Sequence, residues 1–172
     1  LGPPEIAHIC KIGGHSHLKV LTSLKKAGMD SMPGAGAEIL SDRVRRLISK
    51  GKCTGQEWLT IMEVAHSVGL TTSATMMFGH VEKTFHVAHH LFELLNLQKR
   101  TNGITEFVPL PFVADEAPIF RRGQARPGPT FKETILVHSV ARILFQGQIN
   151  NIQGSWVKMG LPGLKFLLSS GT

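Results

Sequence analysis

Two carboxylates in the sequence follow segments with strand character, each beside a glycine-containing turn. Glu38 comes after the run Pro-Gly-Ala-Gly, and Glu82 ends the run Gly-His-Val-Glu. Ligands of parallel sheets and barrels bind at the carboxyl ends of the strands. Glycine there permits positive φ and a close approach of the backbone to a ligand. The same two residues could instead stabilise the N-termini of neighbouring helices, so both interpretations stay open.

Histidines form a second group that could do chemistry. His86, His89 and His90 have the i, i+3, i+4 spacing of one helix face, which could bind a metal. No Cys or acidic residue completes a metal site at matching spacing, and an exposed helix face is the simpler interpretation. His80 differs, because it lies inside the strand-end motif and is expected to point at the same mouth as Glu82.

The overall composition describes one globular unit. The chain has 172 residues, 42% of them hydrophobic, and a net charge of +7. Lys and Arg are scattered, which favours a basic enzyme surface over a nucleic-acid or anionic-membrane partner. No apolar run reaches the ~18 residues of a membrane span. Cys10 and Cys53 form no C-x-x-C pair, so free thiols and a cytoplasmic location are expected.

Helix signals and strand signals alternate along the chain. Thr54 with Glu57, and Thr130 with Glu133, have the spacing of capping boxes. A third helix is predicted from Thr84, and two earlier ones over 17–28, ending on Gly28 as C-cap, and 42–50, beginning after Ser41. The apolar stripes of the three main helices are predicted at Trp58, Ile61, Met62 and Ala65, at Phe85, Ala88, Phe92 and Leu95, and at Val140, Ile143 and Leu144.

Four strands are predicted, over 29–32, 71–78, 105–110 and 151–156. Alternation with helices predicts parallel β/α units. Two strands have a polar face, formed by Thr71, Ser73 and Thr75 and by Asn151, Gln153 and Ser155. The interior of a barrel accommodates polar faces better than a doubly wound sheet. A complete barrel takes about 250 residues, so the prediction is half a barrel of about four β/α units, incomplete on its own.

A long Pro-rich loop covers residues 108–131. It carries the charged residues Asp115, Glu116, Arg121, Arg122 and Arg126. Long loops over a barrel mouth tend to be functional.

The motifs "PGAGAEIL", "TTSATMMFGHVE", "TEFVPLPF", "ARPGPTF" and "NIQGSWVKMG", taken in order, resemble a known family. The chain is similar to the C-terminal half of radical S-adenosylmethionine (SAM) enzymes that include the deazaflavin (FO) synthase subunits and the menaquinone-pathway cyclases acting on futalosine derivatives. The resemblance covers residues 1–160 and leaves 161–172 as a C-terminal tail. "TEFVPLPFV" followed by "ARPGPTF" looks most like the FO synthase component that joins tyrosine to a ribitylaminouracil.

The resemblance implies a set of site residues. The family pattern G-x-I-x-G-x-x-E is matched only in part, because Thr75 and Met77 replace its first Gly and its Ile. The residues implied to bind SAM are Glu38, Thr75, Met77, Gly79, His80, Glu82, Val108 and Pro109. Those implied to bind substrate are Glu106, Asn151, Gln153 and Ser155.

The resemblance also implies the cofactors and the reaction. SAM and a [4Fe–4S] cluster are the cofactors, and the cluster cysteines, spaced C-x-x-x-C-x-x-C, are expected upstream of Leu1 because the chain holds no such run. The implied reaction transfers the 4-hydroxybenzyl group of L-tyrosine to 5-amino-6-(D-ribitylamino)uracil after radical hydrogen abstraction. No residue of the chain is assigned to the abstraction. The expected partners are these substrates, the missing N-terminal barrel half and a second FO synthase component, fused or separate.

Three alternatives stay open. The chain could be part of a dehypoxanthine-futalosine-type cyclase, or a non-catalytic remnant that pairs with a separate N-terminal half. It could also be a small-molecule-binding β/α protein without radical chemistry. By itself the chain is expected to be inactive.

Overall fold

The computed structural model describes all 172 residues as an α/β structure with one parallel sheet. The strands lie in the order β1 (Ser31–Met32), β2 (Thr71–Phe78), β3 (Ile104–Pro111) and β4 (Asn151–Ile152), and each neighbouring pair is parallel. The predicted parallel β/α arrangement is confirmed. The outer strands β1 and β4 are shorter than predicted, with two residues each.

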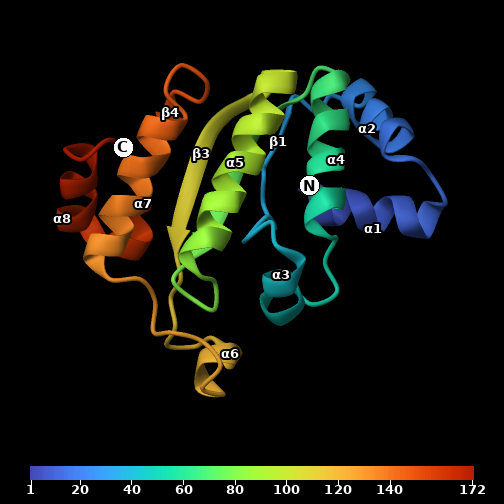
Figure 1. Cartoon of the computed structure of the whole chain (residues 1–172). Helices are drawn as coiled ribbons and strands as arrows, with labels where there is room; N and C mark the ends of the chain where they lie inside the picture. Colours follow the sequence, from blue (N-terminus) through green and yellow to red (C-terminus); the bar gives the residue numbers. More distant parts are fainter.

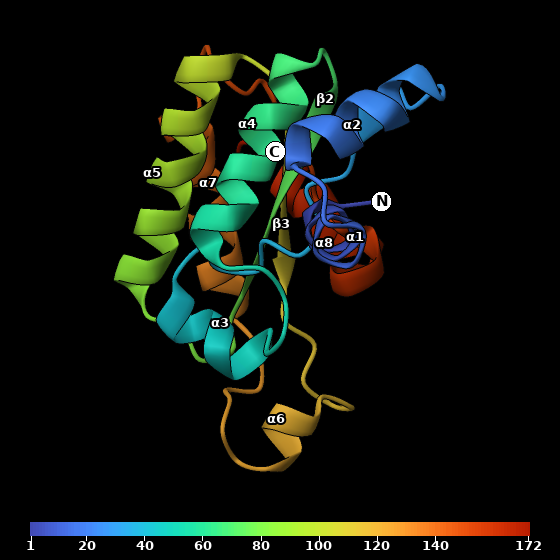
Figure 2. The same cartoon turned by 90° about the vertical axis from the view of Figure 1, so that its right-hand side faces the viewer.

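Eight helices accompany the sheet. Their bounds are α1 (Pro3–Gly13), α2 (His17–Lys26), α3 (Asp42–Ile48), α4 (Gly55–Ser67), α5 (Thr84–Thr101), α6 (Pro118–Arg121), α7 (Phe131–Leu144) and α8 (Trp156–Leu168). Helices α4, α5 and α7 cover one face of the sheet, while α1 and α8 lie near its opposite edges (Figures 1 and 2). Helices α1, α6 and α8 were not predicted. None of the helices is long and apolar enough to cross a membrane.

The two faces of the sheet differ in burial, as alternation along a strand requires. In β2, Ala74, Met76 and Phe78 are buried under the helices, whereas Ser73, Thr75 and Met77 are half-buried on the other face. The register with β3 places Glu106, Val108 and Leu110 beside these three. We call this surface the open face; its six residues are Ser73, Thr75, Met77, Glu106, Val108 and Leu110.

The predicted helix starts are largely confirmed. Thr130 and Glu133 form a reciprocal capping box at α7. At α4 the Thr54 hydroxyl accepts from the Glu57 N–H, but the reciprocal bond is absent. Ser41 is the N-cap residue of α3. The prediction for the end of α2 was wrong by one residue, because its C-cap is Ala27.

The predicted apolar stripe is correct for α4 but only partly correct for α5 and α7, where Leu95 is buried and Leu144 packs against the core. Trp58 and the other predicted α4 residues are buried, but Phe85 is 61% exposed, Phe92 54% and Ile143 73%. In α5 and α7 the inner face instead includes the buried histidines His90 and His138. Each of these histidines has one ring nitrogen hydrogen-bonded, which permits burial. The hydrophobic pattern alone therefore placed several exposed residues on the inner face and missed the buried histidines.

Helix α8 crosses the predicted boundary between residues 160 and 161. Gly160 has a non-helical φ of 69°, so the helix is kinked there. The division into a barrel half and a C-terminal tail stays a prediction.

Candidate functional site

Three loops meet at the carboxyl ends of the strands, below the sheet in Figure 1, where α6 protrudes. Backbone hydrogen bonds join the first of these loops to the end of β2 and the third loop to the second. The Met77 N–H donates to the Glu38 carbonyl at 2.8 Å, and the Arg126 N–H donates to the His80 carbonyl at 2.9 Å. The loops that follow β1, β2 and β3 thus form one continuous surface, at the edge where parallel sheets bind ligands.

Glu38 lies in the loop after β1 with its carboxylate partly exposed. Its backbone has a φ of 44°, which is uncommon for a residue other than glycine. One carboxylate oxygen, Oε1, lies 3.0 Å from Lys52 Nζ. At Gly34 an added Cβ would come within 2.2 Å of the Ser73 carbonyl oxygen, so the loop contacts β2 closely. The sequence placed Glu38 correctly at the strand end but gave no sign of Lys52.

Glu82 is buried and already hydrogen-bonded by its own turn. Its carboxylate accepts from the N–H groups of Gly79 at 2.6 Å and His80 at 2.8 Å. Burial opposes ionisation, but the backbone hydrogen bonds of the turn outweigh it and lower the pKa of Glu82. Glu82 therefore shapes the turn after β2.

His80 is also buried and is neutral in this arrangement. Its Nδ1 accepts from the Val81 N–H, so the proton is on Nε2, which donates to the Met77 carbonyl at 2.9 Å. Burial lowers the pKa of His80 despite the Glu82 carboxylate 3.0 Å from Nδ1. The contact with Glu82 is accordingly not an ion pair, and both side chains hold the turn rather than point freely into the mouth.

Arg126 links the long loop to this turn. Its guanidinium contacts Glu133 Oε1 at 2.7 Å and Glu82 Oε1 at 3.5 Å. The hydrogen bond from Arg126 lowers the pKa of Glu133, and the same contact raises the pKa of Arg126. Two carboxylates from different elements therefore hold one arginine of the loop.

Replacing Arg126 by glutamine is expected to loosen the loop without unfolding the sheet. The variant keeps the backbone bond to His80 but loses two charged contacts, each worth about 1 kcal/mol or less at a partly exposed site. Amide hydrogen exchange in residues 112–129 should then become roughly five-fold faster. The control is Arg100→Gln, which removes a comparably exposed pair with Glu63 elsewhere. Equal exchange in both variants would show that Arg126 does not hold the loop.

The structure brings most of the predicted strand residues together on the open face. Met77 and Val108 are half-buried there, and the Thr75 hydroxyl is bonded to the Gly34 carbonyl at 2.7 Å. Pro109 does not join them, because it pairs with Met76 on the face that the helices cover.

The predicted substrate residues form a separate group. Gln153 Nε2 donates to Glu106 Oε2, and Asn151 Nδ2 donates to the Thr105 carbonyl at 3.0 Å. Glu106 lies five residues before the end of β3, about 17 Å from the loop that follows this strand at ~3.3 Å per residue, and it pairs with Ser73, which the loop after β1 contacts. Ser155 is the N-cap residue of α8. Glu106, Asn151 and Gln153 therefore lie toward the amino end of β3.

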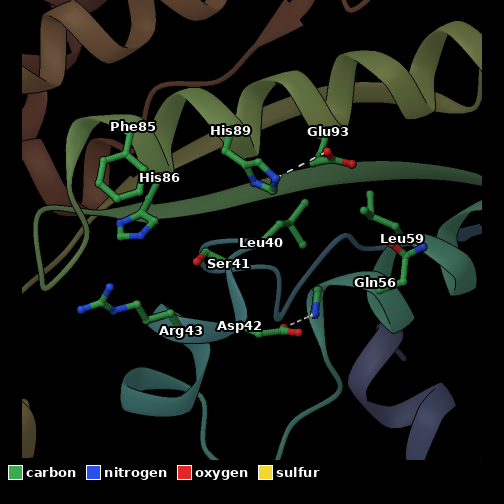
Figure 3. A pocket seen from close by; sticks show the side chains of 11 residues that line it. Leu40, Ser41, Asp42, Arg43, Gln56, Leu59, Phe85, His86, His89 and Glu93 are labelled. Carbon is green, nitrogen blue, oxygen red and sulfur yellow. Dashed lines mark hydrogen bonds and ion pairs between the residues drawn. The ribbon is translucent and has the colours of Figure 1, made fainter.

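The expectation of an exposed histidine face on α5 was wrong. His86 and His90 are buried, and only His89 is exposed. His86 and His89 border a cavity of about 500 Å³ between α3, α4 and α5, where His89 lies 3.6 Å from Glu93 (Figure 3). No three His, Cys, Asp or Glu side chains of the chain are grouped to hold a metal ion.

Cys10 and Cys53 are free, buried thiols that border one cavity of about 940 Å³. Burial raises the pKa of both. Lys52, the ion-pair partner of Glu38, also borders this cavity.

No protein-family model matches the chain. Curated proteins do match it. An "FO synthase" of Nocardia farcinica is 47% identical over 169 residues, which is 98% of this chain and 20% of that protein. An "FO synthase" of Mycobacterium leprae is also 47% identical over 169 residues. A "5-amino-6-(D-ribitylamino)uracil--L-tyrosine 4-hydroxyphenyl transferase" of Methanopyrus kandleri is 44% identical over 98% of this chain and 46% of its own length. The chain thus spans a fifth to just under half of these relatives.

Proposed function

We propose that this chain is part of an enzyme that joins the 4-hydroxybenzyl group of L-tyrosine to 5-amino-6-(D-ribitylamino)uracil. The chain is homologous over nearly its whole length to FO synthases and to tyrosine 4-hydroxyphenyl transferases. The predicted resemblance to this family is confirmed by the relatives. Since the chain spans less than half of each, the activity of a whole enzyme, its substrates and its partners belong to the proposal.

The proposed architecture is one half of a β/α barrel. Strands β1 and β4 are the edges of the sheet, with two paired residues each, and the open face has polar and half-buried side chains. Unpaired strand edges need a partner, which a further set of strands would provide. Completion by an N-terminal half would enclose the open face as a cavity.

The observation that carries the proposal is the joined surface at the strand ends. Glu38 presents a partly exposed carboxylate there, the Met77 N–H is bonded to the Glu38 carbonyl, and Met77 and Val108 give the neighbouring open face an apolar surface. A carboxylate beside apolar strand residues fits SAM, whose polar ribose and amino acid groups flank an aromatic base. Glu82 would act indirectly, by fixing the Gly79 turn.

The second group on the open face fits the ribitylaminouracil. The Glu106–Gln153 pair offers a carboxylate and an amide, which can accept and donate hydrogen bonds to a uracil ring or to hydroxyl groups. The pair lies on the open face toward the amino end of β3, so it would lie inside the completed barrel, where the enclosed cavity would exclude water.

When bound, SAM and a reduced [4Fe–4S] cluster would supply the radical that starts the reaction. Cluster ligands are cysteine thiolates, and this chain has only two cysteines, both buried and without the C-x-x-x-C-x-x-C spacing. The cluster is therefore assigned to upstream residues. What this chain contributes is binding, orientation and the exclusion of water. A cytoplasmic location is part of the same proposal.

The test is to sequence upstream of the Leu1 codon and express the chain with that segment. We expect an in-frame extension that contains C-x-x-x-C-x-x-C. After anoxic reconstitution with iron and sulfide, the assembled protein should convert tyrosine and ribitylaminouracil to an adduct seen by mass spectrometry. Conversion of a dehypoxanthine futalosine substrate instead would favour the cyclase. An extension without the three cysteines, or no conversion of either substrate, would favour the non-catalytic alternative.

A further inference from the structure

Arg45 in α3 is a buried arginine without a carboxylate partner. The residue is 3% exposed, and its guanidinium donates mainly to backbone carbonyls, with one longer contact of 4.0 Å from Nη2 to Cys53 Sγ. Nε and Nη2 donate to the Cys53 carbonyl at 3.0 and 2.6 Å. Nη1 donates to the Gly36 carbonyl at 3.0 Å and to the Ala37 carbonyl. Burying a charged group is unfavourable unless hydrogen bonds replace its water. The geometry around this guanidinium is therefore closely constrained.

The carbonyls bound by Arg45 lie next in the chain to the two residues of an ion pair, Glu38 and Lys52. Gly36 and Ala37 directly precede Glu38, and Cys53 directly follows Lys52. Glu38 Oε1 and Lys52 Nζ are 3.0 Å apart. The planar, rigid guanidinium thus sets the distance between the two backbone segments that carry the pair.

The rest of the turn is fixed in the same way. The carbonyl of Gly34 accepts from the Thr75 hydroxyl at 2.7 Å, and that of Ala35 accepts from Trp58 Nε1 at 3.1 Å. The Glu38 carbonyl accepts from β2. Every carbonyl from residue 34 to residue 38 therefore has a donor, supplied by β2, α3 or α4. Such support can maintain the strained φ of Glu38.

The ion pair retains free hydrogen-bonding capacity. Glu38 Oε2 accepts no hydrogen bond from the chain, and the Lys52 ammonium has one side-chain partner for its three donors. The Lys52 side chain is 46% exposed. A ligand ammonium can therefore bind Glu38 while a ligand carboxylate binds Lys52.

We propose that Arg45 is a positioning residue, which holds Glu38 and Lys52 as a preset pair of opposite charges for the zwitterionic α-amino acid group of a ligand. The inference rests on the proposed function, in which tyrosine and SAM both carry such a group. Lys52 becomes a further binding residue of the site, and Arg45 acts through it and through Glu38.

The first test measures the coupling between Glu38 and Lys52 by urea unfolding of Glu38→Gln, Lys52→Met and the double variant. In the wild-type background we expect a coupling of about two- to five-fold in the folded-to-unfolded ratio. It should vanish in Arg45→Lys, or in Arg45→Gln if the lysine variant does not fold. The matched control is Arg142→Lys, since Arg142 also donates to carbonyls, of Gly171 and Asn150, far along the chain. A coupling that survives in the Arg45 variants overturns the proposal.

The second test measures binding of four probes to the assembled protein by calorimetry. L-Tyrosine and S-adenosylhomocysteine carry the zwitterion, whereas tyramine and 5′-methylthioadenosine do not. We expect Arg45→Lys to weaken the binding of one or both zwitterionic probes at least ten-fold and to leave the binding of tyramine and 5′-methylthioadenosine unchanged. The zwitterionic probe whose binding weakens identifies the ligand. Equal weakening of all four would mean that Arg45 only supports the fold. If no probe binds wild-type protein, the proposed function fails, and the coupling measurement still decides the role of Arg45.

Discussion

Replacing Gly79 by alanine is expected to lower the free energy of unfolding by about 3 kcal/mol. Gly79 has a φ of 93°, and an added Cβ would lie 2.2 Å from Pro129 Cδ and 2.4 Å from Pro129 N. A left-handed conformation costs an alanine about 1–2 kcal/mol, and overpacking costs another 1–3 kcal/mol. Because one of the clashing atoms belongs to the backbone, a side-chain rotation of the neighbour cannot relieve the contact.

Gly69→Ala provides the matched control for this substitution. Gly69 has a φ of 79° but no atom within 4 Å of its added Cβ, so it should lose only the conformational part, about 1 kcal/mol. Urea unfolding gives both values. Gly79→Ala should also speed amide exchange at Arg126, whose N–H is bonded to His80. Equal losses in the two variants would contradict the close packing of residues 128–129 on the turn.

Stability is expected to fall steeply between pH 6.5 and pH 4 because two histidines are buried in the neutral form. Burial lowers the pKa of His66 to about 4 and that of His90 to about 3. An unfolded histidine has a pKa near 6.5, so below that pH the unfolded state binds protons that the folded state does not. The stability that the neutral rings contribute is complete above pH 6.5. It decreases on acidification, on the order of 1 kcal/mol per pH unit for each ring.

The hydrogen bonds of His66 show why the folded state resists its protonation. The Thr101 hydroxyl donates to the Leu97 carbonyl, so it accepts from His66 Nδ1 at 2.7 Å. His66 Nε2 then accepts from the Thr72 hydroxyl at 2.9 Å. A second proton could bind only at Nε2, whose lone pair already accepts the hydrogen bond from Thr72. Glu63 favours the charged form, but burial outweighs it.

The measurement is the free energy of unfolding from urea titrations at half-unit steps from pH 8 to pH 4. His66→Gln cannot take up this proton, so its curve should be shallower than wild type by roughly 1 kcal/mol per pH unit. Its stability at pH 8 serves as the internal reference, because any packing loss appears there. A slope equal to that of wild type would show that His66 is not the titrating group.

The sequence by itself determined the parts of this protein that depend on short-range signals. Alternating burial in β2 follows from its own residue order, and Thr130 with Glu133 formed the predicted capping box. Glu38 lies after a strand end as predicted, because a glycine turn after an extended segment specifies that position locally. The family resemblance rested on continuous motifs and was confirmed for the same reason.

Only the tertiary structure decided which of these groups are free to bind a ligand. In the sequence Glu82 and Glu38 have the same setting, after a strand and beside a glycine turn. In the structure Glu82 is buried and hydrogen-bonded within its own turn, whereas Glu38 is half-buried beside Lys52. Lys52 is 14 residues from Glu38, and Arg45 joins their segments through carbonyls that no pattern of side chains reveals. Long-range hydrogen bonds of the backbone and the burial of neutral histidines depend on packing between elements, and a local pattern of residue types does not encode either.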